Sequence, residues 1–259
     1  MTQQMRGLGG DGLTEVFYAP DHVLISRGYH DPMPHRHLAK HLLISLQDGF
    51  VCKVKDQTVP CSGICIGSDI LHTIQQASGG LLVFLFDETS DLAEQLETLY
   101  LKGKPFCALD KALCSRMAGE WAQNGSDSNE FDRRMLLACG LGPSKRSKHD
   151  SRIAMLLDSL HGMEEIGGDT LQTLCRTVGL SQSRLSHIFK EQVGISLGSY
   201  LVLDRIRKTF RYVGIGEDLT TACIHAGFDS SSHFSATYKR MFGLSFRDFR
   251  KNTIIHEVT

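Results

Sequence analysis

Short apolar segments alternate with turn residues in the first third of the chain. The turns contain Asp31-Pro32, Asp48-Gly49 and Gly79-Gly80. Several short strands at regular spacing are typical of a β-sandwich or a small barrel. We therefore predict a β-rich domain over residues 1–87, with strands at 16–19, 22–28, 41–46, 51–54, 63–67 and 81–86.

The pattern changes to a helical one after Asp87. Apolar residues then recur every three or four positions, which indicates amphipathic helices. The three stripes are Leu92, Leu96, Leu99 and Tyr100, then Leu109, Leu113, Met117 and Trp121, then Phe131, Met135, Leu136 and Cys139. We predict a helical segment over residues 88–140. Residues 141–151 combine turn residues and charge without periodicity, and we predict a linker there.

An internal repeat occupies the C-terminal part. Residues 171–196 and 219–245 align, with leucines, cysteines and glycines in matching positions. Each copy predicts a helix, a tight turn and a second helix, because a glycine falls where the bend needs a left-handed residue. The matching pairs are Leu171 and Leu219, Cys175 and Cys223, Gly179 and Gly227, and Gly194 and Gly243. Ser181 can cap the second helix of the first copy, and Asp229 or Ser230 that of the second.

Charge separates the two parts of the chain, although the formal net charge is only −1. Residues 170–251 contain 12 Lys and Arg against 6 Asp and Glu, whereas residues 1–169 contain 16 against 22. A basic C-terminal part suggests a nucleic-acid partner for that part alone. Ordinary surface variation is the alternative.

The C-terminal part resembles the DNA-binding domain of the AraC/XylS family of bacterial transcription regulators. The run 227–251 is similar to the second-motif signature of the family, and 199–210 resembles its long connecting helix. The resemblance implies an all-α domain over residues 152–259 with two helix-turn-helix motifs. The expected fold class is therefore α+β multidomain.

The same resemblance implies roles for individual side chains. Recognition helices present residues of their N-terminal half to base edges, and basic residues nearby hold phosphates. The implied base-facing residues are Ser183, Ser186, His187, Ser231, Ser232 and Ala236. The implied phosphate contacts are Lys190, Arg205, Arg207, Lys239 and Arg240. Ala236 offers only apolar contact, and the serines could equally be a solvated helix start.

Four histidines suggest the function of the first domain. His35 and His37 are two residues apart and share one face of an extended strand, and His41 keeps the same parity. With His72 they resemble the ligand positions of a cupin barrel, except that His41 stands where a cupin has Glu. The resemblance implies a cupin-like sensor barrel with flanking helices. Four imidazoles could hold one divalent transition metal, namely zinc, nickel, copper or iron. An organic effector without metal, or histidines that are merely satisfied polar residues, remain alternatives.

Together these features predict a cytoplasmic, sequence-specific transcription regulator that is not an enzyme. The expected partners are double-stranded DNA, a small-molecule or metal effector, RNA polymerase and a second copy of the chain, paired through residues 88–140. No membrane partner is expected, because the longest apolar run, 81–86, is too short to span a bilayer. The scattered cysteines predict reduced thiols rather than disulfides. The alternative is a metal-dependent cupin enzyme, an oxygenase or isomerase, with an appended DNA-binding domain.

Overall fold

The computed structural model describes residues 14–28, 33–75, 77, 79–123, 127–142, 150–243, 245–247 and 253–258. The chain divides into two compact units. The first contains residues 1–144 and 241–259, and the second contains residues 145–240. The predicted linker lies mostly outside the described residues.

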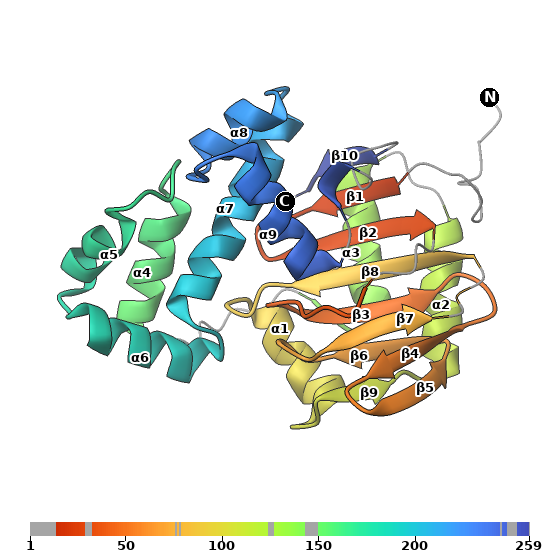
Figure 1. Ribbon diagram of the computed structural model, residues 1–259. Helices are drawn as coiled ribbons and strands as arrows, with labels where there is room; N and C mark the ends of the chain where they lie inside the picture. The colour runs from red at the N-terminus through yellow and green to blue at the C-terminus, as the bar shows by residue number, and fades with distance from the viewer. Residues whose placement is uncertain are drawn as a thin grey trace. The chain divides into compact units, whose positions relative to one another are not determined.

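Two β-sheets form the framework of the first unit (Figure 1). The larger has the order β10-β1-β2-β8-β3-β6-β9, and the smaller has the order β5-β4-β7. The strands are β1 (Thr14–Tyr18), β2 (His22–Gly28), β3 (Lys40–Ser45), β4 (Phe50–Val54), β5 (Gln57–Cys61), β6 (Gly63–Ile66), β7 (His72–Gln75), β8 (Gly80–Phe86), β9 (Phe106–Ala108) and β10 (Thr253–Glu257). The six predicted strands are confirmed, while β5, β7, β9 and β10 are additional.

Both faces of the larger sheet are buried, and the alternation of side chains assigns each residue to a face. Leu42 and Phe84 belong to the core beneath the helices. Leu43 and Val83 belong to a second core, shared with Cys52 and other residues of the smaller sheet. The interior between the two sheets is therefore reached by the odd-numbered positions of β3 and β8.

Helices cover the outer face of the larger sheet, as the view of α2 and α3 behind the strands shows (Figure 1). They are α1 (Asp91–Leu96), continued by the π-helical turn η1 (Glu97–Leu101), α2 (Lys111–Ala122) and α3 (Ser128–Ala138). Their predicted stripes pack on the sheet except at Leu99, which is exposed, and Met117, Trp121 and Met135 are almost fully buried. Any contact with a second copy would therefore use the opposite faces of these helices.

The C-terminal strand β10 belongs to the first unit. It pairs in parallel with β1, from Thr14 opposite Thr253 to Tyr18 opposite Glu257. The ring of His256 stacks on Phe17 at 4.6 Å between centroids. The expected all-α domain extended to residue 259, and here the structure differs. Residues 253–257 form a strand because they pair with the main-chain groups on the side of β1 that does not face β2.

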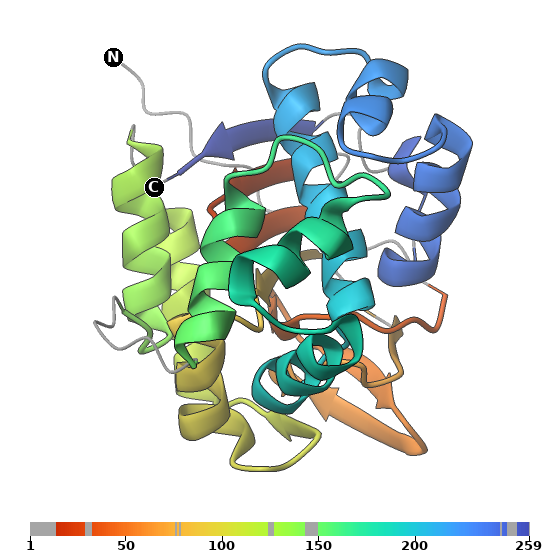
Figure 2. The ribbon, with the colours of Figure 1, turned by 90° about the vertical axis from the view of Figure 1, so that its left-hand side faces the viewer.

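The second unit is helical and contains both predicted motifs. Its elements are α4 (Ser151–His161), α5 (Thr170–Val178), α6 (Gln182–Val193), α7 (Leu197–Gly214), α8 (Leu219–His225) and the first part of α9 (Ser231–Phe242). In Figure 2, α4 and α5 lie side by side, coloured green, next to the long cyan α7. The predicted fold class, a β-rich part followed by a helical part with two helix-turn-helix motifs, is confirmed.

The turns of the two motifs have the predicted chemistry. Gly179 and Gly227 adopt positive φ angles of 67° and 94°. The hydroxyl of Ser181 accepts a hydrogen bond from the backbone N–H of Arg184, and that of Ser230 accepts one from His233. Each cap satisfies a helix N–H that has no partner within the helix.

Two further predictions concern the whole chain. Within the described residues, no helix is long and apolar enough to cross a membrane. All eight cysteines are free and five of them are buried, as the sequence predicted.

Candidate metal centre and nucleic-acid interface

The four predicted histidines converge in the first unit. His41 lies on β3 with interior parity, and His72 begins β7 of the smaller sheet. His35 pairs with His72 through two main-chain hydrogen bonds of 3.0 and 3.1 Å, which brings the segment before β3 alongside β7. His37 follows two residues later. All four residues are buried, with exposures between 0% and 7%.

Backbone carbonyls orient three of these imidazoles in the same way. The Nδ1–H group of His35 donates to the carbonyl of Met33 at 2.7 Å. His41 and His72 donate likewise to the carbonyls two residues before them, Ala39 at 3.2 Å and Ile70 at 2.9 Å. A carbonyl oxygen only accepts, so the proton of each neutral ring resides on Nδ1 and the lone pair on Nε2.

The Nε2 atoms face one another inside the cluster. Those of His41 and His72 are 3.2 Å apart, and those of His35 and His37 are 3.1 Å apart. One ligand atom each of His35, His37 and His72 lies within 4.8 Å of the others, whereas His41 is not part of this group of three and adjoins it through His72. Nitrogen ligands at 2.0–2.1 Å in a tetrahedral zinc site lie about 3.3–3.4 Å apart, so the spacing within the His35–His37 and His41–His72 pairs matches that of two ligands on one metal ion.

Protonation does not relieve the facing lone pairs of His41 and His72 near neutral pH. Burial and, to a smaller extent, the charge of a protonated His35 lower the pKa of His72 from 6.5 to about 4. Burial also holds the pKa of His41 well below its usual value, with His72 acting in the same direction. A metal cation satisfies such lone pairs without a proton, which is why neutral imidazole is a common metal ligand.

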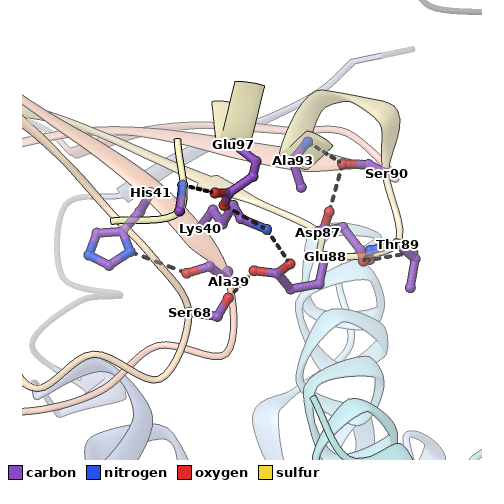
Figure 3. A network of polar contacts seen from close by, with 11 residues as sticks. Ala39, Lys40, His41, Ser68, Asp87, Glu88, Thr89, Ser90, Ala93 and Glu97 are labelled. Carbon is purple, nitrogen blue, oxygen red and sulfur yellow. Dashed lines mark hydrogen bonds and ion pairs between the residues drawn. The ribbon is translucent and has the colours of Figure 1, made fainter. Parts of the chain in front are cut away.

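A polar network anchors β3 next to the cluster (Figure 3). Lys40 points away from its neighbour His41, and its Nζ lies 2.7 Å from Glu88 Oε2 and 3.9 Å from Glu97. The hydroxyl of Ser68 donates to the other oxygen of Glu88. Glu88 is buried, so this pairing compensates its charge and fixes the start of β3.

The end of α9 also reaches the cluster, which the sequence did not predict. The ring of Phe242 lies 5.3 Å from that of His37. A Cβ atom on Gly243 would lie 2.7 Å from Nδ1 of His35 and 2.9 Å from the carbonyl oxygen of Met33. Residues 241–259 belong to the first unit, so these contacts lie within it.

The predicted DNA-facing residues of the first motif lie on α6. Ser183, His187 and Lys190 are exposed, and Ser186 is half-buried. The opposite face is closed, with Leu185, Ile188 and Phe189 buried. The exposed face is thus available for a duplex, as the predicted base-facing role requires.

The predicted residues of the second motif lie on α9. Ser232, Ala236, Lys239 and Arg240 are exposed, and Ser231 is half-buried. The buried side of α9 carries Phe234, Tyr238 and Met241. The predicted residues of both helices thus lie on the solvent-exposed sides, and their contacts with DNA stay a prediction.

The two arginines of α7 have partners inside the second unit. Arg205 Nε donates to the carbonyl of Ile166 at 2.9 Å. The Arg207 guanidinium lies over the ring of Tyr200 at 5.6 Å. Arg205 thus links α7 to the segment before α5, whereas Arg207 packs on a ring of its own helix, and the contacts of both with phosphate stay a prediction.

Two exposed polar residues near the helix starts were not predicted. Arg184 lies in the first turn of α6 next to Ser183 and is exposed. His233 lies in the first turn of α9, where its Nδ1 is 2.9 Å from Asp229 Oδ2. Helical spacing alone could have identified Arg184 and His233, because they lie next to the predicted DNA-facing residues on the exposed sides of α6 and α9.

Comparison with known proteins bears on the second unit first. A family described as a helix-turn-helix domain matches residues 174–252. The chain is 26% identical over 120 residues to the bifunctional transcriptional activator/DNA repair enzyme Ada of Escherichia coli. It is 33% identical over 81 residues to the arabinose operon regulatory protein of the same organism.

These sequence matches are partial. They cover 44% of this chain and 34% of Ada, and 31% of this chain and 28% of the arabinose protein. The chain thus spans about a third of the length of these curated relatives. A structural match is broader. A crystal structure of unsaturated fatty acid bound ToxT from Vibrio cholerae has a TM-score of 0.57 at 11% identity, over 89% of this chain and 95% of ToxT. At that identity the likeness establishes a shared fold.

Proposed function

We propose that this chain, whose residues 174–252 form a helix-turn-helix domain of the AraC type, is a DNA-binding transcription regulator controlled by a metal ion in its first unit. The observation that carries the metal control is the set of four buried imidazoles, whose Nε2 atoms face one another in two pairs, His35 with His37 and His41 with His72. The proposed regulator acts in the cytoplasm on double-stranded DNA and has no catalytic activity.

The two motifs support DNA binding. Each has a glycine turn, a capped second helix and an exposed face with short polar and basic residues. Such helices enter the major groove and place their N-terminal residues against base edges. The excess of basic residues in 170–251 attracts the phosphate backbone. The relatives Ada and the arabinose protein are named as an activator and an operon regulator.

The metal would be held by His35, His37, His41 and His72. Four nitrogen ligands complete a tetrahedral set, and closed sites of this kind are structural or regulatory rather than catalytic. The carbonyls of Met33, Ala39 and Ile70 supply the outer hydrogen bonds that fix the tautomers of ligating histidines.

An organic effector is the second candidate, favoured by the fatty acid bound to ToxT. In this chain, apolar residues of both sheets, among them Phe50, Ile64 and Val83, pack together between the sheets. A buried histidine cluster beside a packed apolar core favours a small cation over a bulky ligand.

DNA binding is tested by selecting sites from a random DNA pool with the purified chain. Replacement of Lys239 by alanine should weaken binding to all selected sites alike, and should make the log–log salt slope less steep by about 0.9. The matched control is Lys53→Ala, which removes the same charge from an exposed position on β4. If the chain prefers no DNA sequence, the proposed function as a DNA-binding regulator is refuted.

Metal control is tested by mass spectrometry and by DNA binding with and without a chelator. We expect about one transition metal ion per chain, lost in the double variant His41→Ala/His72→Ala. His225→Ala is the control, because this exposed histidine pairs with Glu217 outside the cluster. If the wild-type chain takes up no stoichiometric metal, an organic effector such as a fatty acid becomes the better proposal.

A further inference from the structure

We propose that Phe242 and Gly243, the residues that end the second recognition helix, form part of the wall of the histidine cluster and couple metal binding to DNA binding by α9. This inference rests on the proposed function, since it requires both a metal in the cluster and DNA on α9. It adds a mechanism by which the two sites communicate.

The first step is the close fit of Gly243. Its φ of +72° places it in the left-handed region, where glycine ends a helix without strain. The space that a side chain would occupy is already filled by the imidazole of His35 and the carbonyl of Met33. The backbone at residue 243 can approach the cluster so closely only because the residue has no Cβ.

The second step concerns the orientation of His35. The two groups that Gly243 contacts are the donor and acceptor of one hydrogen bond, Nδ1–H of His35 to the carbonyl of Met33. That bond aims Nε2 of His35 into the cluster. Outer hydrogen bonds of ligating histidines typically influence metal affinity by 10- to 100-fold. A displacement of residue 243 should therefore change the orientation of His35 and, with it, the metal affinity of the cluster.

The third step is the continuity of α9. This helix runs from Ser231 to Phe242, and the boundary between the two units falls within it. The DNA-facing Ser232 and Ala236 and the phosphate-facing Lys239 thus share one helix with Phe242. A metal that fixes His35 and His37 favours one position of the helix end. Metal binding then increases the population of one position of α9, and DNA binds that position with a different affinity. By the same linkage, DNA binding changes the affinity for the metal.

The repeat provides a matched control for the experiment. Gly194 ends α6 as Gly243 ends α9, and its φ is +88°. No heavy atom lies within 4 Å of a Cβ at Gly194. Gly194→Ala therefore introduces the same left-handed backbone strain as Gly243→Ala, but without a collision at the histidine cluster.

The test measures Zn²⁺ affinity by calorimetry on the full chain. It also measures DNA affinity, with and without Zn²⁺, on a site selected from a random pool. For wild type we expect zinc to change DNA affinity at least about fivefold. Gly243→Ala should bind zinc about 10- to 100-fold more weakly and lose most of the zinc effect on DNA. Gly194→Ala should retain wild-type zinc affinity.

A second variant covers the case in which Gly243→Ala does not fold. Phe242→Leu keeps the helix and its glycine cap but removes the ring that faces His37, and it should reduce the zinc effect on DNA. Unchanged zinc affinity and an unchanged zinc effect in the folded variants would overturn the coupling through α9 and leave metal control intact. A wild-type chain that binds no zinc, or whose DNA affinity zinc does not alter, would overturn the metal control itself.

Discussion

A buried ion pair in the first unit makes its stability depend on pH. The imidazole of His22, at the start of β2, bridges two carboxylates. Its Nδ1 lies 2.8 Å from Asp21, and its Nε2 lies 3.0 Å from both oxygens of Asp132 on α3. His22 and Asp132 are buried, whereas the side chain of Asp21 is half exposed. The pair therefore ties the larger sheet to a helix that covers it.

The magnitude follows from the pKa of His22. Burial lowers this pKa, but the hydrogen bonds and charges of Asp132 and Asp21 outweigh burial and raise it from 6.5 to about 9. Because a tenfold change in proton binding corresponds to about 1.4 kcal/mol, the folded protein gains about 3 kcal/mol from this proton. A raised pKa stabilises the folded state fully below pH 6.5, and the gain is lost as the pH rises through about 9.

Trp121 provides a specific probe for this effect. It is the only tryptophan of the chain, it is buried, and its ring lies 5.4 Å from that of Phe131 in the first unit. Urea unfolding followed by tryptophan fluorescence should give a free energy of unfolding that decreases between pH 6 and pH 9.5. The comparison is with Asp132→Asn, which keeps an acceptor but removes the charge.

The difference between the two proteins isolates the ion pair. Burial raises the pKa of Cys52 and Cys139 to about 12, so ionisation of unfolded thiols also favours unfolding at high pH, equally in both proteins. The advantage of wild type over Asp132→Asn should shrink by about 2 kcal/mol over this range, since Asp21 retains part of the effect. Parallel pH profiles for the two proteins would refute the charged bridge.

Four further substitutions test the packing, a buried ion pair and the DNA interface. Gly227→Ala would place a Cβ 2.2 Å from a backbone carbonyl and should cost about 3 kcal/mol or more, against about 1–2 kcal/mol for Gly179→Ala, which meets open space. Thermal unfolding followed by circular dichroism distinguishes the two. His187→Ala should relax selected-site preference at one or two base pairs, by about 1–3 kcal/mol, and an unchanged motif would contradict base reading. Lys40→Ala should destabilise by about 3 kcal/mol because it leaves the buried carboxylate of Glu88 without its charged partner, and a loss below 1 kcal/mol would contradict this role.

The sequence predicted those elements whose pattern is local. Strand β2 has its predicted bounds, because an alternating apolar run lies between turn residues. Strand β5 was missed because it has no fully buried residue and contains Pro60, which an edge strand tolerates but a strand pattern does not favour. Strand β10 was missed because its pairing with β1 joins the two ends of the chain.

In the histidine cluster, too, the local sequence pattern predicted the residues but not the features that depend on the fold. Spacing along the chain placed His35, His37 and His41 on one strand face, since positions two or four residues apart share a face, and the resemblance to a cupin barrel added His72. Their orientation depends on carbonyls two residues earlier in the chain, and thus on backbone conformation in the segments before β3 and β7. No residue type signals that conformation, so the sequence could name the candidate ligands but not their tautomers.

Gly243 illustrates why a repeat can predict a residue without its full role. Its alignment with Gly194 explains the glycine as a helix cap, and both residues have the positive φ that this role needs. The cap alone would tolerate an Asn at moderate cost, because Asn also adopts the left-handed conformation. At Gly194 the surrounding space permits such a side chain, whereas at Gly243 the ring of His35 and the carbonyl of Met33 do not. One backbone requirement therefore governs both copies of the motif, and only in the second copy would a side chain also displace the histidine cluster.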